Sequence, residues 1–156
     1  YFDTEFYGWC DIGYFRNRFN KDTPISLLNN WPNPEKVIKL NKDKIYYACI
    51  NNNTQFIQQL FRLINDKDYN ELPRHPIPEY QFSIAGGFYI AHKERVSWWK
   101  NFYDEKLNLY FKYNYLIKDD QIIVADCVFS KLKHFQICKE DDVRYDNWFL
   151  FQRFLN

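Results

Sequence analysis

The sequence lacks several features that would assign it to a broad class of protein. Its 156 residues include no methionine and only four glycines. No stretch reaches the length of a membrane span, about 20 apolar residues, and no early apolar segment resembles a signal peptide. Lysine plus arginine (21) nearly balances aspartate plus glutamate (20), which leaves a net charge of +1. This balance argues against non-specific nucleic-acid binding, and we expect a cytoplasmic protein without a membrane span.

Neither the cysteines nor the histidines are spaced for metal binding. The four cysteines contain no C-x-x-C pair, which argues against a zinc knuckle or a thioredoxin-type motif. The three histidines contain no i, i+4 pair. Cys10, Cys49 and Cys127 lie within apolar runs, where a free thiol usually behaves as a small buried side chain. We therefore expect buried free thiols.

The amino-acid composition predicts a folded domain. Apolar residues make up 46% of the chain and aromatic residues 21%, which excludes a disordered protein. The length suits a single domain spanning residues 1–156. Because the chain begins with Tyr1 and contains no methionine, we expect it to be a fragment of a longer protein.

Strand-like and helix-like segments alternate along the chain. Short apolar runs predict strands at residues 6–10, 37–40, 44–50, 81–91 and 135–138. Helical spacing and capping residues predict helices at residues 23–28, 54–64, 93–115, 119–131 and 148–155. This alternation favours an α/β sandwich with a mixed, mostly parallel sheet. In the longest helix, Trp99, Tyr103, Leu107 and Tyr110 should face that sheet.

Asp11 directly follows an apolar strand, in the sequence Trp9-Cys10-Asp11-Ile12-Gly13. In open α/β sheets, ligands bind outside the carboxyl ends of the strands. A carboxylate at that place can hold a divalent cation that neutralises a diphosphate, and Gly13 permits close backbone approach. The alternative is that Asp11 only caps a turn, as Asp-x-Gly sequences commonly do.

Gly86 and Gly87 interrupt an apolar, β-rich run, Ala85-Gly86-Gly87-Phe88-Tyr89-Ile90. Glycine weakens a strand, so two adjacent glycines need a structural or functional reason. One reason is a bend in the strand, and the other is a ligand that lies against the backbone. The sequence leaves both open.

Asp119, Asp120 and Gln121 stand at the expected start of a helix, ahead of an apolar segment. A carboxylate at this position can simply cap the helix. Carboxylates accept hydrogen bonds, and amides both donate and accept them, so the same side chains could also hold sugar hydroxyls. Each of the three motifs is weak evidence of function by itself. Their order and separation along the chain are more specific.

A resemblance to a known family rests on three segments, FYGWCDIGYFR, IAGGFYIAHKE and DDQ. Together they resemble the HtrL/YibB family of bacterial and viral proteins, grouped with glycosyltransferases of GT-A fold, over about residues 6–148. More distantly, the layout is similar to family 8 glycosyltransferases, with an Asp-x-Asp metal motif, a glycine-bearing strand and an Asp-Gln pair. The resemblance implies a GT-A-like three-layer sandwich whose N-terminal nucleotide-binding part is missing from this sequence.

The resemblance also implies roles for particular residues. Asp11 matches the first Asp of the metal motif and would bind a divalent cation, Mn²⁺ or Mg²⁺. Gly13 stands in place of the second Asp, which leaves the metal dependence open. Gly86–Gly87 match the glycine-bearing strand beside the acceptor, and Asp120–Gln121 match the catalytic Asp-Gln pair at the donor sugar. The C-terminal histidine ligand of family 8 has no clear counterpart, with His134 as a candidate.

The implied reaction moves a sugar from a nucleotide-diphosphate sugar to a hydroxyl of a glycan, lipid or protein. Charge builds on the leaving diphosphate, where the cation at Asp11 would act, with Arg16 or Arg18 assisting. Asp120 would orient the donor sugar or act as a base, and Gln121 would hold a hydroxyl. The residues expected to bind donor or acceptor are Gly13, Arg16, Gly86, Gly87 and Asp119.

Two interpretations from other classes stay open. The first is a non-catalytic carbohydrate-binding module on a degraded transferase scaffold, which the missing second Asp and the abundant Trp and Tyr favour. The second is an interaction domain without a small-molecule site. The transferase hypothesis predicts that Asp11, Gly86–Gly87 and Asp120–Gln121 converge on one cleft at the edge of the sheet, whereas unrelated turns and caps would be scattered.

Overall fold

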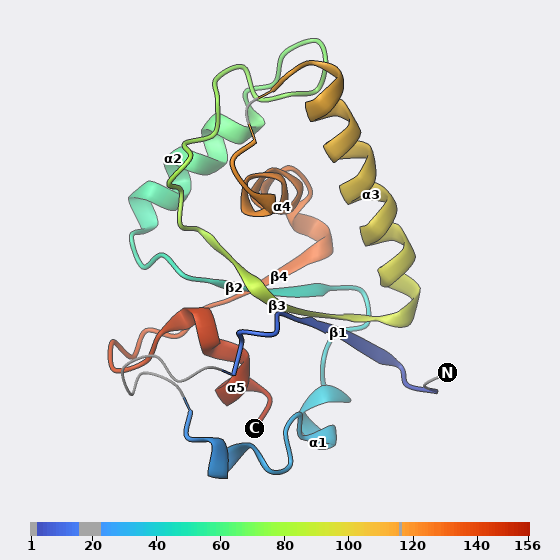
Figure 1. Ribbon diagram of the computed structural model, residues 1–156, viewed down its shortest axis with the longest axis vertical. Coiled ribbons are helices and arrows are strands. Elements are labelled where there is room, and N and C mark those ends of the chain that lie inside the picture. The colour runs from blue at the N-terminus through green and yellow to red at the C-terminus, as the bar shows by residue number, and fades with distance from the viewer. Residues whose placement is uncertain (1–2, 16–22, 116) are drawn as a thin grey trace.

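A four-stranded sheet crosses the middle of the molecule, and helices lie on both of its faces (Figure 1). This computed structural model describes residues 3–15, 23–115 and 117–156. The strands are β1 (Phe6–Cys10), β2 (Ile45–Cys49), β3 (Ile84–His92) and β4 (Phe135–Cys138), in the spatial order β1-β3-β2-β4. The predicted α/β class is confirmed, while the assignment to the GT-A fold stays a prediction.

The prediction of a mostly parallel sheet is wrong, because β3 runs antiparallel to both of its neighbours. Only β2 and β4 pair in parallel among the described strands. After β2, the chain forms a helix and then a loop that returns it to the end of the sheet it had just left. Ile84, the first residue of β3, therefore pairs with Cys49, the last residue of β2. A helix alone would have carried the chain to the opposite end, as parallel pairing requires.

Helices α2 (Thr54–Asn65), α3 (Lys93–Lys112) and α4 (Asp120–Ser130) cover one face of the sheet (Figure 1). The other face carries α1 (Pro34–Val37) and α5 (Leu150–Phe154). Short 3-10 turns are η1 (Ile25–Leu28), η2 (Leu132–His134) and η3 (Asn147–Phe149). No helix in residues 3–15, 23–115 and 117–156 is both long and apolar enough to cross a membrane.

The strand predicted at residues 37–40 is absent, because the chain there leaves a helical turn. Asn33 caps α1, its side chain accepting a hydrogen bond from the Glu35 amide at 2.9 Å. Pro34 occupies the first turn, where its missing N–H is no loss and its fixed φ suits a helix. The capping residues therefore outweigh the β-branched pair Val37 and Ile38.

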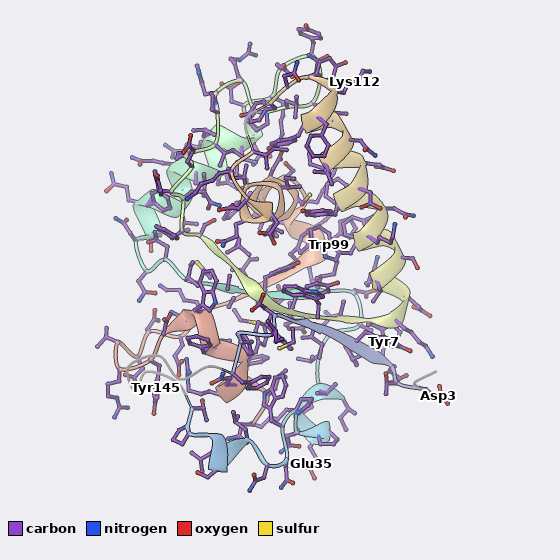
Figure 2. All side chains as sticks on the ribbon, viewed as in Figure 1. Asp3, Tyr7, Glu35, Trp99, Lys112 and Tyr145 are labelled. Atoms are coloured by element: carbon purple, nitrogen blue, oxygen red, sulfur yellow. The ribbon has the colours of Figure 1, made fainter. Side chains whose placement is uncertain are left out.

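The predicted apolar stripe of α3 faces inward, although only part of it meets the sheet. Trp99 points from α3 into the space above the sheet, and its ring contacts those of Tyr47 and Phe135 (Figure 2). Tyr103 and Leu107 are half-buried. Tyr110 is fully buried, but its hydroxyl donates to Asp126 of α4 rather than meeting a strand. Thus α3 begins at the sheet and rises away from it (Figure 1), so that its second half packs on α4.

Helix α4 lies between α2 and α3 and is buried on all sides from Ile122 to Phe129. Asp126 lies in the middle of this helix with no exposed surface. Its carboxylate accepts hydrogen bonds from Lys67 Nζ at 2.5 Å and Tyr110 Oη at 3.0 Å. Ser130 Oγ donates at 2.6 Å, and Lys106 Nζ lies 3.3 Å away. This network satisfies a charge that would otherwise oppose burial of the helix.

The cysteines are free, and three of the four are buried. Cys49 and Cys127 are buried as predicted, and Cys138 is buried as well. Cys10 is exposed, which contradicts the prediction. The reason is that β1 lies at the edge of the sheet, so that one side of its last residue faces no neighbouring strand.

Replacing Asp126 tests this network. In Asp126→Asn, Lys67 and Lys106 lose their counter-charge, and breaking a buried pair in this way typically costs about 3–5 kcal/mol. We expect the free energy of unfolding, measured with urea, to fall by that amount. The control Asp66→Asn removes an exposed partner of Arg74 and should cost under about 1 kcal/mol. Equal, small losses of stability in both variants would show that the network around Asp126 does not stabilise the fold as we expect.

Candidate functional site

Strand β3 bulges at the double glycine. Tyr47 pairs with Tyr89 and Cys49 pairs with Ile84, so Ala48 alone on β2 faces the four residues 85–88 on β3. Bulges bend a strand and redirect its side chains. The bend considered from the sequence is therefore present, and it moves this part of β3 away from β2.

Neighbouring side chains explain why both bulge residues are glycine. A Cβ at Gly86 would lie 3.2 Å from Cγ of Gln121, and one at Gly87 would lie 3.1 Å from Nε1 of Trp148 and 3.2 Å from Cδ2 of Tyr14. Neither glycine has a positive φ. Glycine is thus needed at both positions because side chains from α4, η3 and the segment after β1 approach the backbone closely. An unusual backbone conformation is not the reason.

Asp11 is the first residue after β1, and its backbone continues the pairing of β1 with β3. Its amide donates to the Gly87 carbonyl at 2.9 Å. Its Oδ1 accepts a hydrogen bond from the Gly13 amide at 2.6 Å. Asp11 therefore does cap a turn, as the alternative interpretation of the sequence predicted. Oδ2 accepts no hydrogen bond from the part of the chain that the structure describes. One carboxylate oxygen therefore remains for a ligand.

The three motifs meet in one pocket of about 160 Å³. Six predicted site residues line it: Asp11, Gly13, Gly86, Gly87, Asp120 and Gln121. The predicted convergence is therefore present in the structure, while the chemical roles of these residues stay predictions. Asp119 is the N-cap of α4 and does not line the pocket. Arg16 and Arg18 lie outside the described residues.

Three aromatic residues that were not predicted as site residues also line this pocket: Trp9, Tyr14 and Trp148. For Trp9 a signal existed, because alternation along β1 places it on the same side as Asp11, two positions later. Trp148 was predicted only as the start of a C-terminal helix. Its distance of 61 positions from Gly87 left no local pattern to connect them.

Two carboxylates dominate the electrostatics of the pocket. Burial raises the pKa of Asp120 above its usual value, and the negative charges of Asp119 and Asp11 raise this pKa further. No lysine or arginine is among the described residues that line the pocket. The pocket therefore favours a proton, a cation or hydroxyl groups over a bare anion.

The carboxylate pair suits a divalent cation only when a substrate completes the coordination. No group of three or more His, Cys, Asp and Glu side chains that could hold a metal occurs in residues 3–15, 23–115 and 117–156. His134 contacts Trp98, with ring centroids 4.4 Å apart and planes tilted by 40°, near the end of the sheet opposite to Asp11. Mg²⁺ commonly binds through one or two carboxylates plus substrate phosphates and water. A cation at Asp11 would therefore need a substrate in the same pocket to complete its coordination.

A second pocket of about 330 Å³ adjoins the first and shares Trp9, Gly86 and Asp120 with it. Its other lining residues are Tyr47, Tyr89, Trp99, Lys100, Tyr103, Asp104 and Val124. The helical spacing had predicted Trp99 and Tyr103 as core residues only. We name the two pockets together the cleft, with a polar end at Asp11 and an aromatic end at Tyr89.

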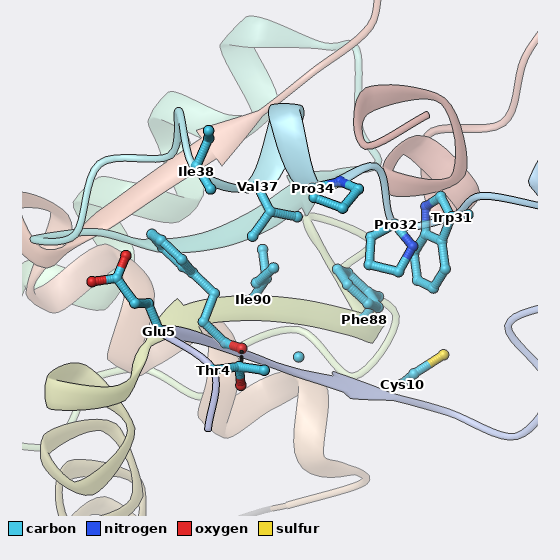
Figure 3. A pocket seen from close by; sticks show the side chains of 12 residues that line it. Thr4, Glu5, Cys10, Trp31, Pro32, Pro34, Val37, Ile38, Phe88 and Ile90 are labelled. Carbon is cyan, nitrogen blue, oxygen red and sulfur yellow. Dashed lines mark hydrogen bonds between the residues drawn. The ribbon is translucent and has the colours of Figure 1, made fainter. Parts of the chain in front are cut away.

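A larger pocket of about 520 Å³ lies on the opposite side of β1, between β1 and α1 (Figure 3). Apolar side chains such as Trp31, Val37, Phe88 and Ile90 dominate its lining. Its one charged lining residue, Glu5, pairs with Lys42 at 2.8 Å. None of the predicted site residues reaches this pocket, so greater volume does not make it the better candidate.

Comparisons with known proteins provide no family for this chain. No protein-family model, curated protein or solved structure matches it. The resemblance to the HtrL/YibB family therefore stays a prediction, and the geometry of the cleft is the basis for a functional proposal.

The two glycines should respond differently to alanine. In Gly87→Ala the new Cβ meets the rings of Trp148 and Tyr14, and such overpacking lowers the free energy of unfolding by about 1–3 kcal/mol. In Gly86→Ala it meets the flexible side chain of Gln121, which can rotate away at a smaller loss of stability. Urea denaturation of both variants checks this. A larger loss in Gly86→Ala would contradict the close-approach explanation.

The acidity of Asp120 should depend on its acidic neighbours. In Asp119→Asn, one negative charge that raises the pKa of Asp120 is removed, so this pKa should fall. Carbon-13 NMR titration of the Asp120 carboxyl group measures it directly, without any assumption about function. Asp43→Asn, at the turn before the other end of the sheet, is the control and should leave the midpoint unchanged. A midpoint unaffected by Asp119→Asn would contradict the effect of Asp119 and leave burial and the Asp11 charge as the causes.

Proposed function

We propose that the protein is a glycosyltransferase that moves a sugar from a nucleotide-diphosphate sugar to an acceptor hydroxyl. The observation that carries the proposal is the meeting of Asp11, the Gly86–Gly87 backbone and Asp120–Gln121 in one pocket. Three segments separated by roughly 75 and 35 positions would seldom meet by chance. The pocket combines carboxylates for a cation with an amide for sugar hydroxyls, beside an aromatic surface.

Three polar residues of the pocket have chemical roles in this proposal. Asp11, through Oδ2, would hold the divalent cation together with the donor diphosphate. When bound, the cation would neutralise charge on the departing diphosphate. Gln121 would hold a hydroxyl of the donor sugar. The acceptor oxygen bonds to the anomeric carbon as the bond to the diphosphate breaks with its electron pair, and Asp120 receives the acceptor proton.

A non-catalytic carbohydrate-binding domain is the second candidate. The observation in its favour is that the described lining of the polar end holds two carboxylates but neither a third metal-binding group nor a basic side chain. Sugar hydroxyls can bind to such a surface without any reaction. Turnover of a donor separates the two candidates.

The decisive experiment incubates the full-length protein with UDP-, GDP- and dTDP-sugars plus Mn²⁺ or Mg²⁺, because the resemblance implies that this chain alone lacks the nucleotide-binding part. It measures release of the nucleoside diphosphate. We expect release from at least one donor, and a loss of about 100-fold or more in Asp11→Asn, because an interaction that matters most in the transition state is removed. The control Asp43→Asn, an exposed partner of Arg95, should retain the parent rate.

A second measurement does not depend on activity. Mn²⁺ should broaden the amide NMR signals of residues 11–13 and 120–121 in the presence of a nucleoside diphosphate, and Asp11→Asn should weaken this effect. Release at the parent rate by Asp11→Asn would reduce Asp11 to a turn residue. Sugar binding without release from any donor would favour the carbohydrate-binding domain.

A further inference from the structure

The two pockets of the cleft form one continuous depression, because Trp9, Gly86 and Asp120 line both of them. The polar end holds about 160 Å³ and the aromatic end about 330 Å³. The aromatic end lies near the lower limit of ligand pockets, which span roughly 300–1,000 Å³. The cleft therefore has room for a second small group beside whatever occupies the polar end.

Aromatic rings from three strands form the floor of the aromatic end. Tyr89 stacks on Trp9 at 6.3 Å with an interplanar angle of 12°, and on Tyr47 at 5.3 Å with an angle of 29°. Trp99 meets both tyrosines edge-on from α3. Trp9 ends the stack at the edge strand, where 45% of its surface is exposed. Such a large exposed indole on a stack of rings offers a flat apolar face to a ligand.

Hydrogen-bonding groups stand around these rings. The hydroxyls of Tyr89 and Tyr103 make no hydrogen bond within the described parts of the chain. Lys100 and Asp104 pair with each other at 2.6 Å across one turn of α3, and Asp120 stands where the two ends meet. One positive and two negative side chains do not suit a phosphate or an acidic sugar. Flat apolar faces with a hydroxyl-binding rim suit a neutral sugar ring.

We propose that the aromatic end of the cleft binds a neutral pyranose of a glycan, which is the acceptor of the transfer. This inference rests on the proposed function and narrows its acceptor from glycan, lipid or protein to a glycan. A pyranose seated on Trp9 would present a hydroxyl towards Asp120, which the polar end shares. A lipid tail would leave the hydroxyls of Tyr89 and Tyr103 without suitable partners.

The test measures binding of lactose, cellobiose and N,N′-diacetylchitobiose by NMR shift perturbation, without any donor. We expect saturable binding of at least one disaccharide, with shifts at residues of the aromatic end. Sorbitol is the control, because it carries hydroxyls but no ring face, and should cause no saturable shifts. Failure of all three disaccharides to bind would overturn the proposal.

Matched variants identify the surface involved. Trp9→Leu keeps an apolar side chain but removes the flat face, and should weaken binding about tenfold. Trp9→Phe should restore most of the affinity. Tyr7→Ala is the control, because Tyr7 lies on the same strand and the same side but does not line the cleft, and it should stay within about twofold. Thermal melting confirms that each variant folds. Undiminished binding in Trp9→Leu would overturn the proposal.

Failure of this inference can be distinguished from failure of the proposed function. Donor turnover without disaccharide binding would overturn the glycan site and leave the transferase standing. Disaccharide binding that depends on Trp9, without turnover of any donor, would overturn the acceptor role and favour the non-catalytic domain. Turnover that rises when the bound disaccharide is added, with sugar transferred to it, would support both proposals.

Discussion

Burial of α4 is the constraint on which the rest of this molecule depends. A helix enclosed by α2, α3 and the sheet can hold Asp126 only because two lysines, a tyrosine and a serine complete its carboxylate. Lys67 comes from the loop after α2, so the same contacts hold that loop against the helix layer. Burial lowers the pKa of Lys67, and the Asp126 charge opposes this effect. With α4 held in this way, Asp120–Gln121 at its N-terminus has a defined position beside β3.

The bulge in β3 determines how the other pocket residues approach Asp120–Gln121. A regular strand would keep residues 85–88 paired with β2, whereas the bulge releases them from β2 while β3 stays paired with β1. That pairing continues to Asp11, whose amide donates to the Gly87 carbonyl. Absence of side chains at Gly86 and Gly87 then allows Gln121 and Trp148 to approach the same backbone. Three distant segments thus meet because β1 and β3 are paired and β3 has no Cβ atoms at the point of contact.

The cleft that results joins two kinds of surface. Like charges at Asp11 and Asp120 make one end receptive to a cation or to hydroxyl groups. Stacked rings at Trp9, Tyr89 and Tyr47 make the other end receptive to a flat apolar face. Asp120 belongs to both, which is why the transfer of a sugar between two occupants of the cleft is the chemistry that we propose.

The sequence alone determined the local elements and the motifs at their ends. Short apolar runs predicted the four strands, and helical spacing or capping residues predicted α2, α3 and α4, because these signals are local in the chain. It did not determine strand direction, since this depends on how the loop after α2 returns the chain, nor the helical turn at Pro34, where caps outweighed β propensity. Tertiary structure decided that Cys10 lies at an exposed edge and that Trp148 reaches Gly87. Such contacts join residues far apart in the chain, and only the packed fold brings them together.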